Sequence, residues 1–259
     1  MRLLFGFIAL VISNTMSSAG SAATEPAGSD PLFTAPPASL SAGEIASLQT
    51  RLADFAQLEH FRADNERMSR VKATAPRIVF FGDSITQDWI TDSRHPASTK
   101  RTYVNRGISG QTTPQMLVRF RQDVVDLRPA AVFVLAGTND IAGNTGATTL
   151  ATIENNLRSM TELAKANGIR VILASLLPAS DYQWRPGLQP APRIRNLNAW
   201  IREYAHSAGA TWVDFHSALT NAEGGMDAVY AADGVHPTDE GYAVMTRLAE
   251  RAIDQALVK

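Results

Sequence analysis

Hydrophobic and polar positions change their pattern at about residue 77. Before it, apolar residues recur at helical spacing from Ile45 to Leu58, behind a Ser41 and Glu44 pair with capping-box spacing. We therefore expect a packed N-terminal helix whose apolar stripe contacts the core. From Arg77 onward, short apolar runs without alternation are separated by segments of helical periodicity. This pattern is typical of parallel strands that are covered by helices on both faces.

Five apolar runs predict five strands. They are Ile78–Phe81, Tyr103–Val104, Ala131–Leu135, Val171–Ala174 and Thr211–Asp214. Four helices are expected between and after these strands. The first starts at Thr113 with Pro114, the second runs from about Ile153 to Asn167 and the third from about Ile194 to near Gly209. The last lies around Val244 to Ile253, after a cap at Thr238. The sequence thus predicts an α/β domain, in which ligands bind where the parallel strands end.

The first 40 residues do not fit this pattern. A positive start at Arg2, an apolar run from Leu3 to Ile12 and small residues up to Ala23 predict a secretory signal. The run of about ten residues is half of the ~20 that a spanning helix needs; a buried or membrane-anchoring helix is the alternative. The expected organisation is a signal peptide at 1–23, a linker at 24–40, an N-terminal helical extension at 41–76 and one domain at 77–259.

Composition and charge exclude several classes of function. The 24 Lys and Arg residues nearly balance the 25 Asp and Glu residues, so the net charge is −1. This excludes a whole-protein basic surface for nucleic acid and gives no electrostatic attraction to anionic membranes. The chain has no Cys, which excludes disulfides, a thiolate nucleophile, Cys-ligated zinc and a lipoprotein anchor. We expect a bacterial periplasmic or secreted protein without stable membrane insertion once the signal is removed.

Polar or glycine residues follow three of the predicted strands where each strand ends. Ser84 follows the first strand on a strand-to-helix turn, with its hydroxyl exposed and its N–H near a helix N-terminus. Gly107 follows the second strand and offers an unobstructed N–H, and Asn139 follows the third with a side-chain amide. Each alone has a structural explanation as a helix cap, a turn glycine or an Asx-turn. Together they predict one site at the edge of the sheet.

A carboxylate and a histidine near the C-terminus complete this site. Asp233 precedes His236 by three residues, so it can hold the histidine tautomer that deprotonates Ser84. The alternative base is His216, which has Asp214 close by; we favour His236. With Ser84 as nucleophile and three donors (the Ser84 and Gly107 N–H groups and the Asn139 side chain), the set predicts acyl transfer.

These segments resemble the four blocks of the SGNH (GDSL) hydrolase family, in the order that the family shows. Ser84, Gly107, Asn139 and His236 fall on its four named positions, with Asp233 as the triad acid. The resemblance covers residue 77 to the C-terminus. It implies a three-layer α/β/α flavodoxin-like sandwich with a five-stranded parallel sheet of order 2-1-3-4-5. It also implies ester hydrolysis through a covalent acyl-enzyme, with no metal or other cofactor.

The segment after the fourth predicted strand is a candidate substrate loop. Tyr182, Trp184 and Arg185 lie there among four prolines, between Leu177 and Pro192. The tryptophan suits stacking on a sugar ring, and the arginine suits a polar group; an ordinary loop whose tryptophan packs on the body is the alternative.

The resulting hypothesis is an exported serine esterase acting on short-chain acyl esters, first of all O-acetyl groups on carbohydrate. Its partner is then a small-molecule or oligosaccharide ester. No long apolar insertion is visible that would cover a fatty chain. The alternatives are a lysophospholipase, thioesterase, arylesterase or acyltransferase of the same family, or a non-catalytic carbohydrate-binding relative.

Overall fold

The computed structural model describes residues 40–89, 100–146 and 148–258. The predicted signal peptide at 1–23 and all but the last residue of the predicted linker at 24–40 lie outside these ranges. Both therefore stay predictions.

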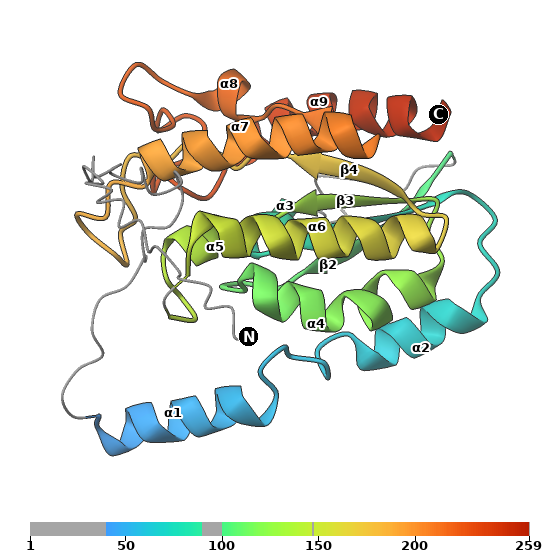
Figure 1. Ribbon diagram of the computed structural model, residues 1–259, viewed down its shortest axis with the longest axis horizontal. Helices are drawn as coiled ribbons and strands as arrows, with labels where there is room; N and C mark the ends of the chain where they lie inside the picture. Colours follow the sequence, from blue (N-terminus) through green and yellow to red (C-terminus); the bar gives the residue numbers. More distant parts are fainter. Residues whose placement is uncertain (1–39, 90–99, 147, 259) are drawn as a thin grey trace, which may run out of the picture.

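Five parallel strands form one sheet in the order β2-β1-β3-β4-β5 (Figure 1). The strands are β1 (Arg77–Gly82), β2 (Thr102–Gly107), β3 (Ala131–Leu135), β4 (Arg170–Ala174) and β5 (Thr211–Val213). The expected fold class and strand order are confirmed. Strand β2 is longer than the two residues expected, because it pairs with the whole of β1, from Arg77 with Thr102 to Gly82 with Gly107.

Helices cover both faces of this sheet (Figure 1). The helices of the described ranges are α1 (Ala42–Ala53), α2 (Arg62–Arg70), α3 (Ser84–Trp89), α4 (Thr113–Asp123), the 3-10 helix η1 (Val125–Leu127), α5 (Thr138–Ile141), α6 (Leu150–Ala166), α7 (Ala191–Ala208), α8 (His216–Leu219) and α9 (Asp239–Val258). The four helices expected from periodicity are confirmed as α4, α6, α7 and α9. Helices α4, α6 and α7 pack on one face, and α3 and α9 on the other.

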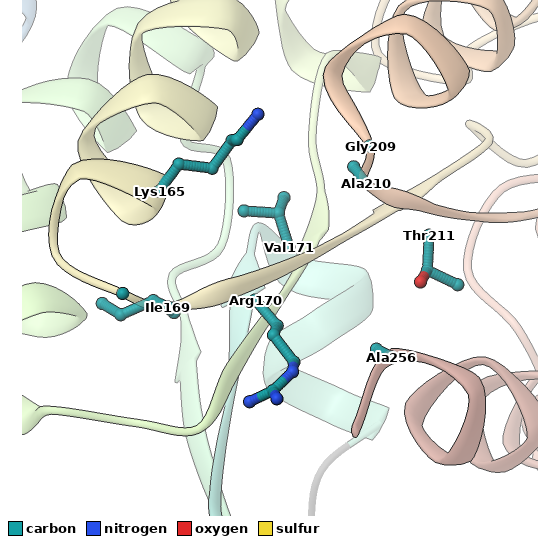
Figure 2. A pocket seen from close by; sticks show the side chains of 9 residues that line it. Lys165, Ile169, Arg170, Val171, Gly209, Ala210, Thr211 and Ala256 are labelled. Atoms are coloured by element: carbon teal, nitrogen blue, oxygen red, sulfur yellow. The ribbon is translucent and has the colours of Figure 1, made fainter. Parts of the chain in front are cut away.

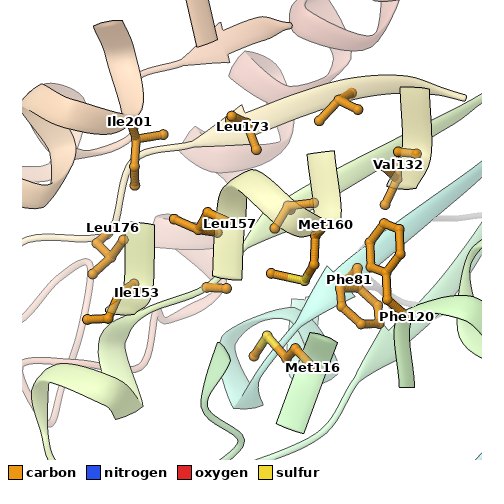
Figure 3. Close-up of a cluster of buried hydrophobic side chains, with 14 of the residues drawn as sticks. Phe81, Met116, Phe120, Val132, Ile153, Leu157, Met160, Leu173, Leu176 and Ile201 are labelled. Carbon is orange, nitrogen blue, oxygen red and sulfur yellow. The ribbon is translucent and has the colours of Figure 1, made fainter. Parts of the chain in front are cut away.

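Alternate residues of β1 feed two separate cores. Val79 and Phe81 belong to the cluster with α4, α6 and α7, whereas Ile78 and Phe80 belong to the cluster with α3 and α9. Figure 3 shows Phe81 beside Phe120 of α4, and their ring centroids are 5.3 Å apart in an edge-to-face contact. Because both faces of the strand are buried, its sequence is apolar throughout instead of alternating.

Local capping explains where two of these helices begin. The side chain of Gln115 accepts the Thr112 N–H at 3.0 Å, and Pro114 lies in the first turn of α4. The expected Thr238 cap of α9 is confirmed, because its hydroxyl oxygen accepts the Gly241 N–H at 3.3 Å.

Helix α1 corrects one expectation. Its apolar stripe was predicted to contact the core, but Ile45, Leu48 and Leu52 are 45%, 37% and 76% exposed. The helix also ends at Ala53, so Leu58 lies beyond it. Figure 1 shows α1 standing away from the layers. The prediction was wrong because helical periodicity reports which residues share a face and does not say what that face meets.

Candidate active site

Ser84 and His236 meet at the carboxyl edge of the sheet. Ser84 is the first residue of α3, two positions after the end of β1, and His236 lies on the loop before α9. The Ser84 hydroxyl and Nε2 of His236 are 3.0 Å apart. At this distance the serine hydroxyl can donate a hydrogen bond to the histidine ring, the geometry that a nucleophile and its base require.

Asp233 holds His236 from its other side. Its Oδ2 lies 2.7 Å from Nδ1 of His236, and its Oδ1 accepts the N–H groups of Val235 and His236 at 2.9 and 2.7 Å. Burial alone would raise the pKa of Asp233. The hydrogen bonds outweigh burial and hold the pKa below its usual value, and the bond from the His236 ring has the largest effect among them. The carboxylate therefore stays ionised and accepts the Nδ1 proton, which leaves Nε2 free to accept from Ser84.

The alternative base lies in a different setting. Nδ1 of His216 is 3.1 Å from the Thr220 hydroxyl, and Asp214 accepts the N–H and hydroxyl of Ser217 at 2.9 and 2.7 Å. Asp214 therefore caps the start of α8 and is not hydrogen-bonded to His216 among the described residues.

The glycine expected as a donor is already engaged. The Gly107 N–H donates to Oδ1 of Asn105 at 2.8 Å, and a Cβ on Gly107 would lie 2.2 Å from the Gln87 nitrogen. Gly107 thus allows close packing against α3 and has no N–H to spare. Gly110, at a φ of 76°, has open space around it, and within the described ranges its N–H has no acceptor. The difference arises because Asn105 folds its side chain over the first glycine of the turn.

Asn139 already uses both of its side-chain amide hydrogens, one of them on Asp83, the residue before Ser84. Its Nδ2 donates to Oδ2 of Asp83 at 3.2 Å and to the Gln111 carbonyl at 3.1 Å. Its Oδ1 accepts from Nδ2 of Asn144 at 2.8 Å, which fixes the orientation of the amide. Both donated bonds are at the long end of the normal range, so an oxyanion nearby would compete for one of these hydrogens.

Two buried carboxyl groups, those of Asp83 and Asp140, lie near Ser84 and the Asn139 turn. Burial raises the pKa of Asp83 to about 7, while the Ile85 N–H and the charge of His236 oppose the rise. Burial also raises the pKa of Asp140 to about 6, although Asp140 accepts hydrogen bonds from the N–H and hydroxyl of Thr113. The floor of the site therefore carries less negative charge at neutral pH than two ordinary aspartates would.

One buried cation joins the turns that carry the site. Arg119 of α4 donates to the carbonyls of Gly82 and Arg106 at 3.0 and 2.9 Å, and to the Gln111 side chain at 2.5 Å. These acceptors lie at the end of β1, near the end of β2 and beside Gly110. Asp123, whose side chain is fully buried like that of Arg119, lies 3.0 Å from Arg119 and compensates its charge. Arg119 thus links the ends of β1 and β2 through hydrogen bonds from its buried side chain.

The predicted substrate loop overhangs the histidine, but its residues differ in exposure. The Trp184 ring is 41% exposed and its centroid lies 6.3 Å from that of His236. Tyr182 was expected to contact substrate, yet it is buried, and its ring stacks under Trp184 at 4.9 Å. Its role is therefore to support Trp184. Nε1 of Trp184 donates to Asn144 at 3.2 Å, which ties the loop to the Asn139 turn.

A polar pocket of about 480 Å³ lies beside the substrate loop, and both Trp184 and Arg185 line it. Its lining residues are Gln57, Ser109, Gly110, Gln115, Asn144, Thr145, Trp184 and Arg185. Amides, hydroxyls and a guanidinium group dominate this lining, so the pocket suits a hydrogen-bonding partner.

A second pocket, of about 360 Å³, lies at the opposite edge of the sheet (Figure 2). Arg170 and Thr211, the first residues of β4 and β5, line it. This pocket lies where the parallel strands begin, whereas Ser84 lies where they end, so the two are on opposite edges of the sheet. Within the described residues, no three His, Asp or Glu side chains are arranged to hold a metal ion, and no helix there is long and apolar enough to cross a membrane.

Sequence reasoning missed several residues around the site. Gly110 was visible as the second glycine of its turn, and Arg119 as a charge on the apolar face of α4 beside Met116 and Phe120. Asn144 and Gln57 gave no signal, because their positions depend on contacts with distant segments.

Comparison with known proteins agrees with this geometry. The GDSL-like Lipase/Acylhydrolase family matches residues 80–244. The crystal structure of a GDSL-like lipase from Bacteroides thetaiotaomicron is 41% identical, with a TM-score of 0.73, over 78% of this chain and all of that one. The isoamyl acetate-hydrolyzing esterase 1 homolog of Bos taurus is 29% identical over 64% of this chain and 76% of its own length.

A further relative is the uncharacterized lipoprotein YqeF of Bacillus subtilis, which is 31% identical over 39% of this chain. That match spans 48% of YqeF, about half of its length. Since the family match covers most of the chain and the site lies within it, this chain belongs to the GDSL-like lipase/acylhydrolase family of carboxylic ester hydrolases.

Proposed function

We propose that this protein is an exported serine esterase that removes short acyl groups, chiefly O-acetyl groups, from carbohydrate. The observation that carries the proposal is the continuous hydrogen-bonded chain from Asp233 through His236 to Ser84. Such a chain is the arrangement that activates a serine hydroxyl for acyl transfer.

In the proposed reaction, Oγ of Ser84 attacks the ester carbonyl carbon and its proton passes to Nε2 of His236. The tetrahedral intermediate collapses to an acyl-enzyme, and the imidazolium gives its proton to the departing alcohol oxygen. Water then attacks the acyl-enzyme, with His236 again as base, and the carboxylic acid leaves. Asp233 stabilises the imidazolium in both steps.

We propose that the oxyanion is bound by the N–H groups of Ser84 and Gly110 and by the side chain of Asn139. Gly110 replaces Gly107 in this role because the Gly107 N–H is held by Asn105. Asn139 contributes when one of its Nδ2 hydrogens turns from the long hydrogen bond to Asp83 or Gln111 toward the oxyanion. Preorganised donors of this kind supply a large part of the rate of acyl transfer.

The proposed substrate class follows from the walls of the site. The polar pocket is lined mainly by polar side chains, and each methylene of a fatty chain needs apolar surface to gain its ~0.8 kcal/mol of burial. Trp184 offers an exposed ring face beside His236, which suits stacking on a sugar. The name of the Bos taurus relative, an isoamyl acetate-hydrolyzing esterase, also favours a short acyl group.

Export is proposed from the N-terminal sequence of residues 1–23. Expressed in a Gram-negative bacterium, the full chain should appear in the periplasm or medium, shortened at its N-terminus. A full-length chain in the cytosol would contradict export without affecting the proposed chemistry.

The catalytic residues are tested by covalent labelling and turnover. An organophosphate should add its mass to one peptide containing Ser84, and Ser84→Ala should abolish labelling. His236→Ala should lower kcat by several orders of magnitude, as removal of a triad member does, while the matched control His216→Ala keeps most of it. Labelling of another serine, or loss of activity only in His216→Ala, would overturn the assignment.

The substrate class is tested with a chain-length series of p-nitrophenyl esters, then with acetylated xylan and pectin oligomers. We expect kcat/KM to be highest for acetyl or butyryl esters and to fall beyond about C6, because longer chains find little apolar wall. A rise through C8 to C12 would favour a lysophospholipase or thioesterase. Oligosaccharide binding without hydrolysis would favour a carbohydrate-binding relative.

A further inference from the structure

A turn outside the family-matched residues 80–244 contributes one wall residue, Gln57, to the polar pocket beside Trp184. We call residues 54–59 the glutamine-held turn, because three glutamine side chains bind three of its carbonyl groups. The bonds run from Nε2 of Gln115 to Phe55 at 2.7 Å, of Gln111 to Ala56 at 2.9 Å and of Gln122 to Leu58 at 2.8 Å. The turn is thereby fixed to α4 and to the loop that precedes it.

The turn is also braced from within. The Asp54 carboxylate accepts the N–H groups of Leu58 and Glu59 at 2.8 and 3.1 Å. Ala56 is buried, at 2% exposure. These hydrogen bonds restrict the backbone on both sides of Gln57, the residue between Ala56 and Leu58.

That residue, Gln57, has an unusual backbone. Its φ is 55°, in the left-handed region that is unfavourable for side chains other than Asn, Asp and Gly. Such strain persists only when the surroundings enforce it, and it concentrates at functional sites. Here the enforced conformation makes Gln57 part of the lining of the polar pocket, and among the described residues its side-chain amide has no partner.

The polar pocket and His236 share one neighbour, Trp184. Trp184 faces His236 at a centroid distance of 6.3 Å and also lines the pocket with Gln57 and Gly110. In the proposed reaction His236 gives its proton to the alcohol oxygen of the ester, so the alcohol portion leaves beside His236, whose ring lies near Trp184. The pocket next to Trp184 is therefore within reach of that alcohol portion.

We infer that Gln57 binds the hydroxyl groups of that alcohol and is a specificity-determining residue for polyhydroxylated esters. The inference rests on the proposed function and extends the site to a segment outside the matched family region. A glutamine amide both donates and accepts, as do vicinal hydroxyl groups of a sugar. The neighbouring Ser109 and Thr145 hydroxyls and the Arg185 guanidinium offer the same kind of partner.

The test compares kcat/KM for acetylated xylan and pectin oligosaccharides with that for p-nitrophenyl acetate. The key variant is Gln57→Gly, which removes the side chain and relieves the positive φ, so the melting temperature should hold or rise. We expect its kcat/KM on the oligosaccharides to fall about 5- to 10-fold, the factor of one lost hydrogen bond. Its kcat/KM on p-nitrophenyl acetate should stay within about twofold, since that leaving group has no hydroxyl substituents.

Two further variants separate recognition from structure. Gln57→Asn, which tolerates the same φ and keeps a shorter amide, should recover part of the oligosaccharide activity. Gln122→Met releases the Leu58 carbonyl and lies outside the pocket, so it should lower the melting temperature and leave the ratio of the two kcat/KM values unchanged. A change of that ratio in Gln122→Met would show that loosening the turn suffices, and would overturn the role of Gln57.

The inference and the proposed function fail differently. If Ser84 is labelled and p-nitrophenyl acetate is hydrolysed, but Gln57→Gly leaves the ratio unchanged, the inference is wrong and the esterase stands. Hydrolysis of p-nitrophenyl acetate with no activity on acetylated oligosaccharides also overturns the inference. If Ser84→Ala keeps full activity, the proposed function itself fails.

Discussion

Gly107 and Gly110, three residues apart at the end of β2, have different structural roles. Gly107 lies against the backbone of α3, where a Cβ would meet the Gln87 nitrogen at 2.2 Å, whereas Gly110 has open space and a positive φ. The first glycine is thus needed for packing, and the second for the course of the turn. At this scale, one side chain, that of Asn105, decides which N–H group is available to a ligand.

Substitution of each glycine by alanine should separate these roles. Gly107→Ala should lower the free energy of unfolding by about 2–3 kcal/mol or more, because the helix backbone cannot move aside. Gly110→Ala should cost about 1 kcal/mol from the positive φ alone. It should also lower kcat about tenfold or more with little change in KM, since it misplaces the proposed oxyanion donor.

Urea unfolding and p-nitrophenyl acetate kinetics measure both effects. If Gly110→Ala keeps normal kcat while a folded Gly107→Ala loses it, the proposed donor is wrong.

At the scale of elements, α4 connects the site to the N-terminal segment. Its residue Arg119 binds the ends of β1 and β2, and its residue Asp123 accepts Nδ2 of Asn65 from α2 at 2.5 Å. Burial lowers the pKa of Arg119 to about 10, and Asp123 opposes the change. The buried ion pair therefore holds together α2, α4 and two strands.

Arg119→Leu should lower the free energy of unfolding by roughly 3–5 kcal/mol, because it leaves Asp123 buried without a counter-charge. The matched control is Arg70→Leu, which breaks the exposed 3.8 Å pair with Glu66 and should cost less than about 1 kcal/mol. The double variant Arg119→Met, Asp123→Leu should recover part of the loss, since no charge is then buried alone. Equal effects of Arg119→Leu and Arg70→Leu in urea unfolding would contradict this account.

At the scale of the whole molecule, the buried Asp83 links stability to pH. Its pKa in the folded protein is about 7, against 3.8 for an ordinary aspartate. Between these values the folded protein keeps a proton that the unfolded chain releases. The contribution of Asp83 to stability therefore falls as pH rises from 4 to 7 and is constant above.

The difference in the free energy of unfolding between the wild type and Asp83→Asn isolates the contribution of Asp83. Other carboxyl groups, including Asp233 with its lowered pKa, contribute equally to both proteins and cancel in the difference. The wild type should lose up to about 4 kcal/mol relative to the variant between pH 4 and 7, the equivalent of a rise of about three pKa units. Denaturant unfolding at pH 4, 5.5, 7 and 8.5 measures the difference. A constant difference, or one that favours the wild type as pH rises, would show that Asp83 has no raised pKa.

Features encoded within a few neighbouring residues were readable from the sequence. The strand β3 was predicted with its observed bounds, because five consecutive apolar residues buried on both faces leave a local pattern. The spacing of Asp233 and His236 likewise predicted a contact that a short turn makes. The sheet order came from the resemblance carried by four short motifs.

Only the tertiary structure decided which groups meet across long stretches of chain. The stripe of α1 has the same periodicity as a core helix, yet Leu52 is exposed, because periodicity does not name a partner. The glutamine-held turn depends on bonds between residues more than 50 positions apart, such as Gln111 to Ala56. The sequence by itself therefore determined the five strands, the four long helices of the domain and the candidate catalytic motifs. Three-dimensional packing decided which donors are free and what lines the pocket, because hydrogen bonds between distant segments leave no local periodicity.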